Sequence, residues 1–144
     1  MKNYLIVSND GHARGLMTFA YFKKRLSELK LAGRVNVQLA GLMVFQGLKQ
    51  DSGALKVLKK RNIPVTDFRV QAVNEELLGK ADALVAVSEE NHHYLRNTYA
   101  ALPSEVRVLK VSSIIDGKEE TYEKAFEKIT EGLEQEFQSL LSKT

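Results

Sequence analysis

The 144-residue chain is 44% hydrophobic and 27% charged, an ordinary globular composition, and its length predicts a single domain over residues 1–144. Its 21 basic and 18 acidic residues are interspersed, so the net charge of +3 gives little support for binding to nucleic acid or to acidic membranes. The lack of cysteine excludes disulfides and thiolate metal sites, and without a secretory leader or a membrane-length apolar stretch we expect a cytoplasmic protein.

The chain opens on a short apolar run, residues 4–7, which predicts a strand. Residues 8–13 then predict a turn, and Arg14 begins a helical pattern that stops at Gly33. Such a loop leaves backbone N–H groups at a helix N-terminus, where the macrodipole favours an anion. Arg14 is placed to grip a phosphate or carboxylate with two parallel hydrogen bonds. The predicted anion-binding residues are Ser8, Asn9, Asp10, Gly11, His12, Ala13 and Arg14.

Strand-like and helical segments alternate along the rest of the chain. Three more strands are predicted, at residues 35–39, 83–87 and 106–109. The first alternates apolar and polar side chains, as an edge strand does, whereas the continuous apolar run at 83–87 is typical of a central parallel strand. Four more helices are predicted. The first is capped at Asp51 or Ser52, and the second is capped at Asn74 and ends at Gly79. The third is capped by Ser88 and runs to Tyr99, and the fourth spans 121–141.

This alternation predicts a three-layer α/β fold with a four-stranded parallel sheet, strand order 2-1-3-4, and helices on both faces. In such folds ligands bind at the carboxyl ends of the strands, beside the topological switch point. The loop at residues 8–14 lies where that rule places a site. His92 and His93 are adjacent on a predicted helix and point in different directions, so we expect surface residues and no metal site.

Several motifs, taken in order, resemble those of the low-molecular-weight protein tyrosine phosphatases. That family has an apolar strand followed by Cys, five residues, Arg and Ser, and Ser8 and Arg14 keep this spacing. Further similar segments follow in the family's order: Leu39-Ala40-Gly41, residues 51–58, Asn62-Ile63, Phe68-Arg69, residues 81–87 and Asn91-His92. The resemblance covers nearly the whole chain. It implies the family's fold and a phosphate-bearing ligand, for example a phosphoprotein. It implies no cofactor.

The departures from the family's pattern fall on the residues that carry its chemistry. Ser8 stands where the family has its nucleophilic Cys. A thiol has a pKa of about 8.5, and a hydroxyl, whose pKa is far higher, stays protonated unless a base lies beside it. His12 is the only nearby imidazole, and we expect it to point into solvent. The chain has no Asp-Pro, so the family's general acid is missing; Asp116, before Gly117, is a weak candidate that reads better as a turn residue.

Three polar partners of the family's loop are also replaced. Gly11 stands for a loop Asn and fits the left-handed conformation, Gly15 stands for the Ser after the Arg, and Phe68 stands for a His. One engineered Cys-to-Ser change does not account for this pattern. Asp10 replaces a small Gly and brings a negative charge toward the anion site. Phe45 is the one aromatic in the loop after the second strand, and we expect it to fold onto the core.

These observations favour a catalytically silent or impaired phosphotyrosine phosphatase-like protein that binds a phosphate-bearing or other anionic ligand. Two alternatives remain open. One is an active protein tyrosine phosphatase whose native Cys was replaced by Ser8, or a hydrolase that pairs Ser8 with an unrecognised base. The other is a flavodoxin-like nucleotide-binding module, whose phosphate loop also follows the first strand.

Overall fold

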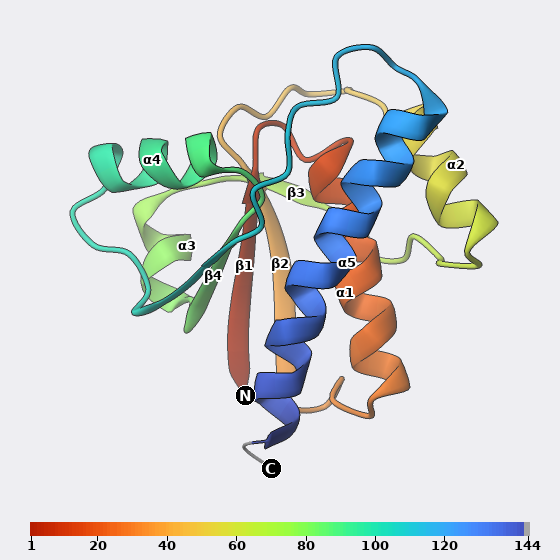
Figure 1. The fold of residues 1–144 in the computed structure, drawn as a ribbon. Helices are drawn as coiled ribbons and strands as arrows, with labels where there is room; N and C mark the ends of the chain where they lie inside the picture. Colours follow the sequence, from red (N-terminus) through yellow and green to blue (C-terminus); the bar gives the residue numbers. More distant parts are fainter. Residues whose placement is uncertain (143–144) are drawn as a thin grey trace.

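The structure, a computed structural model that describes residues 1–142, has a parallel sheet between two groups of helices (Figure 1). The strands are β1 (Lys2–Ser8), β2 (Val35–Gly41), β3 (Val70–Ala72), β4 (Ala83–Ala86) and β5 (Glu105–Val108). Their spatial order is β3-β2-β1-β4-β5, and every pair is parallel. The four predicted strands are present in the predicted relative order.

The prediction of four strands was wrong by one strand at the edge of the sheet. β3 pairs with residues 39–41 of β2, so β2 is not the edge strand that its alternating pattern indicated. Sequence periodicity missed β3 because Val70-Gln71-Ala72 is too short to show a period. The order with β3 beside β2 also differs from the 2-1-3-4-5 order of flavodoxin-like sheets.

Helices cover both faces of the sheet, as predicted. The helices α1 (Arg14–Glu28), α2 (Ser52–Lys60) and α5 (Glu119–Ser142) lie on one face, and α3 (Glu75–Lys80) and α4 (Glu89–Thr98) on the other (Figure 1). α1 ends before the predicted stop at Gly33, because Lys30 adopts a left-handed φ of 59°. No helix within residues 1–142 is both long and apolar enough to cross a bilayer.

The side chains of β1 alternate between two apolar cores. Tyr4 and Ile6 pack with the α1, α2 and α5 side, whereas Leu5 and Val7 pack with α3 and α4. By the same alternation Ser8, the last residue of β1, faces α1. β1 also marks the topological switch point of the sheet, since β2 and β3 lie on one side of it and β4 and β5 on the other.

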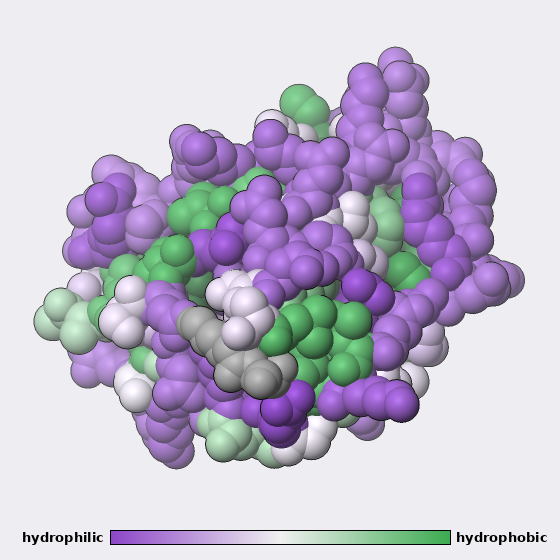
Figure 2. All heavy atoms as spheres, turned by 60° about the horizontal axis from the view of Figure 1, so that its bottom comes forward, coloured by the Kyte–Doolittle hydropathy of each residue, from purple (hydrophilic) through white to green (hydrophobic). Residues whose placement is uncertain are grey.

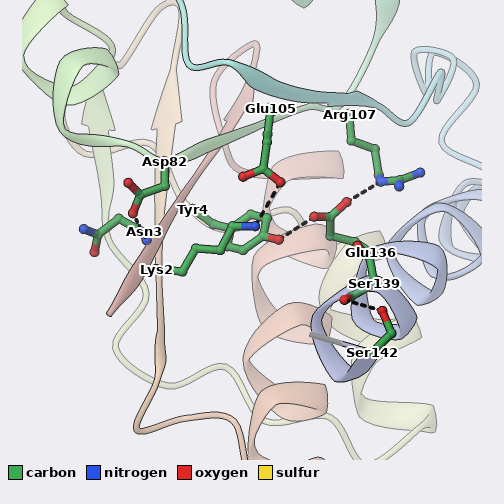
Figure 3. Close-up of polar contacts among 9 residues, drawn as sticks. All are labelled: Lys2, Asn3, Tyr4, Asp82, Glu105, Arg107, Glu136, Ser139 and Ser142. Carbon is green, nitrogen blue, oxygen red and sulfur yellow. Dashed lines mark hydrogen bonds and ion pairs between the residues drawn. The ribbon is translucent and has the colours of Figure 1, made fainter. Parts of the chain in front are cut away.

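A polar cluster near the N-terminal ends of β1 and β5, away from the loop that follows β1, links α5 to the sheet (Figure 3). Tyr4 Oη donates a hydrogen bond to Glu136, and Arg107 Nε donates to the other carboxylate oxygen at 2.7 Å. Burial raises the pKa of Glu136, but these two hydrogen bonds hold it below its ordinary value. Burial and the adjacent carboxylate raise the pKa of Tyr4. Figure 2, in which the bottom of Figure 1 is turned forward, shows a mainly hydrophilic surface with separate apolar patches.

Candidate anion-binding site

The loop between β1 and α1 is held from outside by the chain that follows β2. The carbonyls of Ser8, Asn9 and His12 accept hydrogen bonds from backbone N–H groups of residues 42, 43 and 51, at 2.9–3.0 Å. Gly11 has φ of 83°, which confirms the predicted left-handed conformation. A Cβ at Gly11 would also lie 2.8 Å from the methyl groups of Val70, so β3 closes one side of the loop.

Ser8 lies at the bottom of a small pocket above this loop. Its side chain is only 2% exposed, and its Oγ has no hydrogen-bond partner. The pocket has a volume of about 160 Å³ and is lined on the loop side by Ser8, Asn9, Asp10, Ala13, Arg14 and Gly15. Most of the predicted site residues therefore do come together around one small polar pocket.

Gly15 leaves the space into which the hydroxyl of Ser8 points. A Cβ at position 15 would overlap Ser8 Oγ, at a distance too short for two non-bonded atoms. It would also lie 3.0 Å from Ser8 Cβ and 3.2 Å from Leu39 Cδ1. The glycine that replaces the family's serine is thus matched to the side-chain position of Ser8. Sequence reasoning noted both replacements but not that they depend on each other.

Arg14 is more constrained than the sequence suggested. It is 8% exposed, and its Nη1 donates a 2.6 Å hydrogen bond to the carbonyl of Val111, in the segment after β5. Burial lowers the pKa of Arg14, and the negative charges of Glu90 and Asp10 act in the opposite direction. One arm of the guanidinium is therefore committed to the backbone, which fixes the side chain at the pocket wall.

Asp10 and His12 differ from what the sequence indicated. Asp10 Oδ1 accepts a 3.0 Å hydrogen bond from the backbone N–H of His12, so a carboxylate already occupies one of the loop amides. The expectation of a solvent-exposed His12 was wrong, since its Nδ1 is buried without a partner and its ring packs edge-on against Phe68 at 5.9 Å. Because neither Ser8 Oγ nor His12 Nδ1 has a hydrogen-bond partner, no Ser8–His12 pair is formed.

Asp116 lies outside the pocket, at the start of α5. Its carboxylate accepts from the backbone N–H of Lys118 at 3.0 Å and from Thr121 Oγ1 at 2.8 Å. These hydrogen bonds lower the pKa of Asp116, which makes it a poor proton donor. The residues that line the pocket from the segment after β5 are Ser113 and Ile114, which sequence reasoning missed.

A buried amide network links the loop to α4, and it too was missed from the sequence. Asn91, fully buried, donates from Nδ2 to Asn9 Oδ1 at 2.7 Å. It also forms a capping box with Ser88, each accepting from the other's backbone N–H. The sequence predicted the cap at Ser88, and the structure confirms it, but neither the part of Asn91 in the capping box nor its contact with the loop was predicted.

Three aromatic side chains that the sequence singled out lie away from the pocket. Phe45 does not fold onto the core, because its side chain is 52% exposed. His92 is partly buried and His93 exposed, and both line a wide surface pocket beside α4. Within residues 1–142, no group of three or more potential ligands is arranged to hold a metal ion.

Known proteins resemble the chain over nearly its whole length. The family model "Low molecular weight phosphotyrosine protein phosphatase" matches residues 3–144. A low molecular weight phosphotyrosine phosphatase from Vibrio cholerae O395 superposes with a TM-score of 0.89 at 16% identity, covering 99% of each chain. A YwlE mutant from Bacillus subtilis gives 0.86 at 21% identity, covering 97% of this chain and 99% of that one. A Cys-to-Ser mutant of YwlE arginine phosphatase with a phosphorylated active-site serine gives 0.84 at 22% identity, covering 96% and 95%. No curated protein sequence matches the chain.

Proposed function

Because the chain belongs to the low molecular weight phosphotyrosine protein phosphatase family yet contains no cysteine, we propose that it binds a phosphate-bearing or other anionic ligand without turning it over. The observation that carries this proposal is the pocket at the N-terminus of α1, with Arg14 at its wall and an unpartnered hydroxyl at its base. Helix amides, a cation and a free hydroxyl are all donors, which suit an anion.

Serine in such a pocket is compatible with a phosphoryl group. In the YwlE arginine phosphatase the serine that replaces the active-site cysteine is phosphorylated. Ser8 stands at the corresponding point of the family motif, six residues before Arg14. We therefore expect the ligand's phosphate to lie against Ser8 Oγ, the first amides of α1 and Arg14.

The lack of turnover follows from three separate features. A hydroxyl remains protonated at neutral pH and needs a base, but Ser8 Oγ has no hydrogen-bond partner. Asp116, the acid candidate, is ionised and engaged at the start of α5. Asp10 adds a negative charge beside the pocket, which opposes binding of a dianion.

Thermal denaturation with inorganic phosphate tests the binding site. A ligand at about 100 times its dissociation constant stabilises the folded state by about 2.7 kcal/mol, so the melting temperature of the parent should rise. Arg14→Ala should abolish the rise, measured against its own ligand-free melting temperature. Arg34→Ala removes the same charge from an exposed site before β2 and serves as the control. An equal rise in both variants would refute binding at this pocket.

The active-enzyme alternative is separated by a second variant. If the missing thiol were the only defect, Ser8→Cys should hydrolyse para-nitrophenyl phosphate repeatedly. The proposal instead expects Ser8→Cys to remain folded and nearly inactive, because the acid and the polar partners of the loop are missing as well. The flavodoxin-like alternative is not supported, because the matching family is a phosphatase family and the strand order differs from that of flavodoxin-like sheets.

A further inference from the structure

β5 is an edge strand whose outer side is open. The sheet order ends at β5, and within residues 1–142 only β4 pairs with it. The N–H of Leu109 donates to the carbonyl of Ala86, so the backbone groups of alternate residues in β5 face β4. The backbone groups of Val106 and Val108 therefore face outward. An edge that presents main-chain donors and acceptors to solvent is a template for pairing with another strand.

Both faces of this edge leave room for the side chains of an added strand. On the α4 face, a groove of about 720 Å³ passes Val108 and is lined by side chains of α4, Tyr94 among them. On the α5 face, a hollow of about 320 Å³ lies beside Tyr4 and Arg107. Val106 is 38% exposed although it lies within the sheet. No side chain of the described residues therefore closes the edge.

The charged side chains of β5 alternate with valines. Glu105 and Arg107 both lie on the α5 face (Figure 3). Glu105 accepts from Lys2 Nζ at 3.0 Å, and Arg107 Nε donates to Glu136 at 2.7 Å. By the alternation of a strand, Val106 faces the α4 side. The strand thus carries a negative and a positive charge two residues apart on the same face.

An antiparallel second copy can pair with this edge in two registers, and the charges distinguish them. In the first, Val106 lies opposite the partner's Val106, so Glu105 lies opposite the partner's Arg107 at two symmetric positions. In the second, Val106 lies opposite the partner's Val108, and the two Arg107 side chains face each other. Opposite charges directly across a ladder stabilise it and like charges destabilise it. The charges therefore favour the first register.

We propose that a second copy of the chain pairs antiparallel with β5 about a two-fold axis at Val106, so that two five-stranded sheets become one continuous sheet. The two pairs of Glu105 with Arg107 set the register, and the two Val106 side chains meet on the α4 face. Pro103, which has no N–H, and Lys110, which has a left-handed φ of 60°, end the pairing on either side. So short a ladder gives a weak, reversible dimer.

The occupant is a second copy because the charge pattern of β5 complements itself. β3, at the other edge of the sheet, is Val70-Gln71-Ala72 and has no charge that could set a register. Antiparallel pairing also puts the two anion pockets at opposite ends of the joined sheet, since each pocket lies at the carboxyl end of β1. Dimer formation and anion binding are therefore independent, and each is testable without the other.

Disulfide formation in Val106→Cys tests the register directly, because the chain has no cysteine of its own. Residues opposed in a hydrogen-bonded antiparallel pair have Cα atoms about 5.5 Å apart, a separation that a disulfide spans. Val108→Cys is the control, since the two substituted positions would lie about 13 Å apart along the strands. On mild oxidation we expect Val106→Cys to form a covalent dimer much faster, after each rate is normalised to the reaction of that thiol with a small aromatic disulfide. Equal normalised rates, or a faster rate in Val108→Cys, would refute this register.

Sedimentation velocity across a concentration series tests the dimer itself. The parent should shift from monomer toward dimer as concentration rises. Val106→Pro should stay monomeric, because it removes an outward N–H without breaking a hydrogen bond to β4. Val106→Thr keeps that N–H and the branched shape, and should dimerise as the parent does. Glu105→Arg should weaken the dimer several-fold by placing like charges opposite each other, and circular dichroism should confirm that each variant folds.

Two results of the sedimentation experiment would overturn the proposal. A parent that stays monomeric throughout the series would refute self-pairing and leave the edge to an extended segment of another protein. A dimer that persists in Val106→Pro would place the contact elsewhere on the molecule. Neither result alters the phosphate-induced thermal shift, by which the anion site is judged separately.

Discussion

The fit between Ser8 and Gly15 gives a sharp test of where the serine hydroxyl points. Replacing Gly15 with alanine adds a methyl group 3.0 Å from Ser8 Cβ and 3.2 Å from Leu39 Cδ1, and nearer still to Ser8 Oγ. Overpacking of this kind destabilises the folded state by about 1–3 kcal/mol. Because the Ser8 side chain can rotate away from the added methyl group, we expect a cost of about 1–2 kcal/mol here. Alanine gains about 0.8–1.0 kcal/mol over glycine in a helix, so the net loss should be about 0–1 kcal/mol.

A double-mutant cycle measured by urea denaturation isolates the contact. In a Ser8→Ala background the oxygen is absent, so Gly15→Ala should become neutral or stabilising. The coupling between the two changes should be about 1 kcal/mol, within the range found for residues in contact. Ser8→Ala alone should not destabilise the protein, because it removes a buried hydroxyl that has no partner. If Gly15→Ala stabilised both backgrounds equally, Ser8 Oγ would not face Gly15 and the account of the pocket would be wrong.

Three further predictions concern charged side chains. Glu136→Gln should lower the free energy of unfolding by about 1.5–3 kcal/mol at neutral pH. Since folding lowers the pKa of Glu136, this stabilisation exists above the ordinary glutamate pKa and is lost as pH falls through the folded-state value; urea denaturation across the acid range checks both. Asp10→Asn should tighten phosphate binding several-fold in calorimetry, most at low salt, because it removes a like charge and keeps an acceptor for the N–H of His12. Asp116→Ala should lower the melting temperature slightly, because it removes the acceptor of the Lys118 N–H and of Thr121 Oγ1, and should leave the phosphate-induced rise in melting temperature unchanged.

The elements that the sequence predicted well are those with a strong local signal. The continuous apolar run of β4 and the spacing of Ser8 and Arg14 depend on near neighbours, so the central sheet and the loop were accessible. β3 was not, because three residues carry no period and their pairing is decided by contact with β2. α1 ended early because Lys30, rather than a glycine, adopted the left-handed conformation.

The site's details were less accessible because they depend on residues far apart in the chain. Arg14 bonds to Val111, and Asn9 to Asn91, across separations of 97 and 82 residues. The partial burial of the His12 ring involves Phe68, which reaches the loop only after the chain has passed through β2 and α2. The types of residue at the site were therefore predictable, whereas the partner of each side chain was not.

Release of inorganic phosphate over many turnovers tests the central claim most directly. The measurement is made on the unmodified chain with a phosphotyrosine-type substrate in large excess. The account predicts that free phosphate does not accumulate beyond the amount released in the presence of Ser8→Ala. Sustained phosphate release that is lost in Ser8→Ala would contradict it.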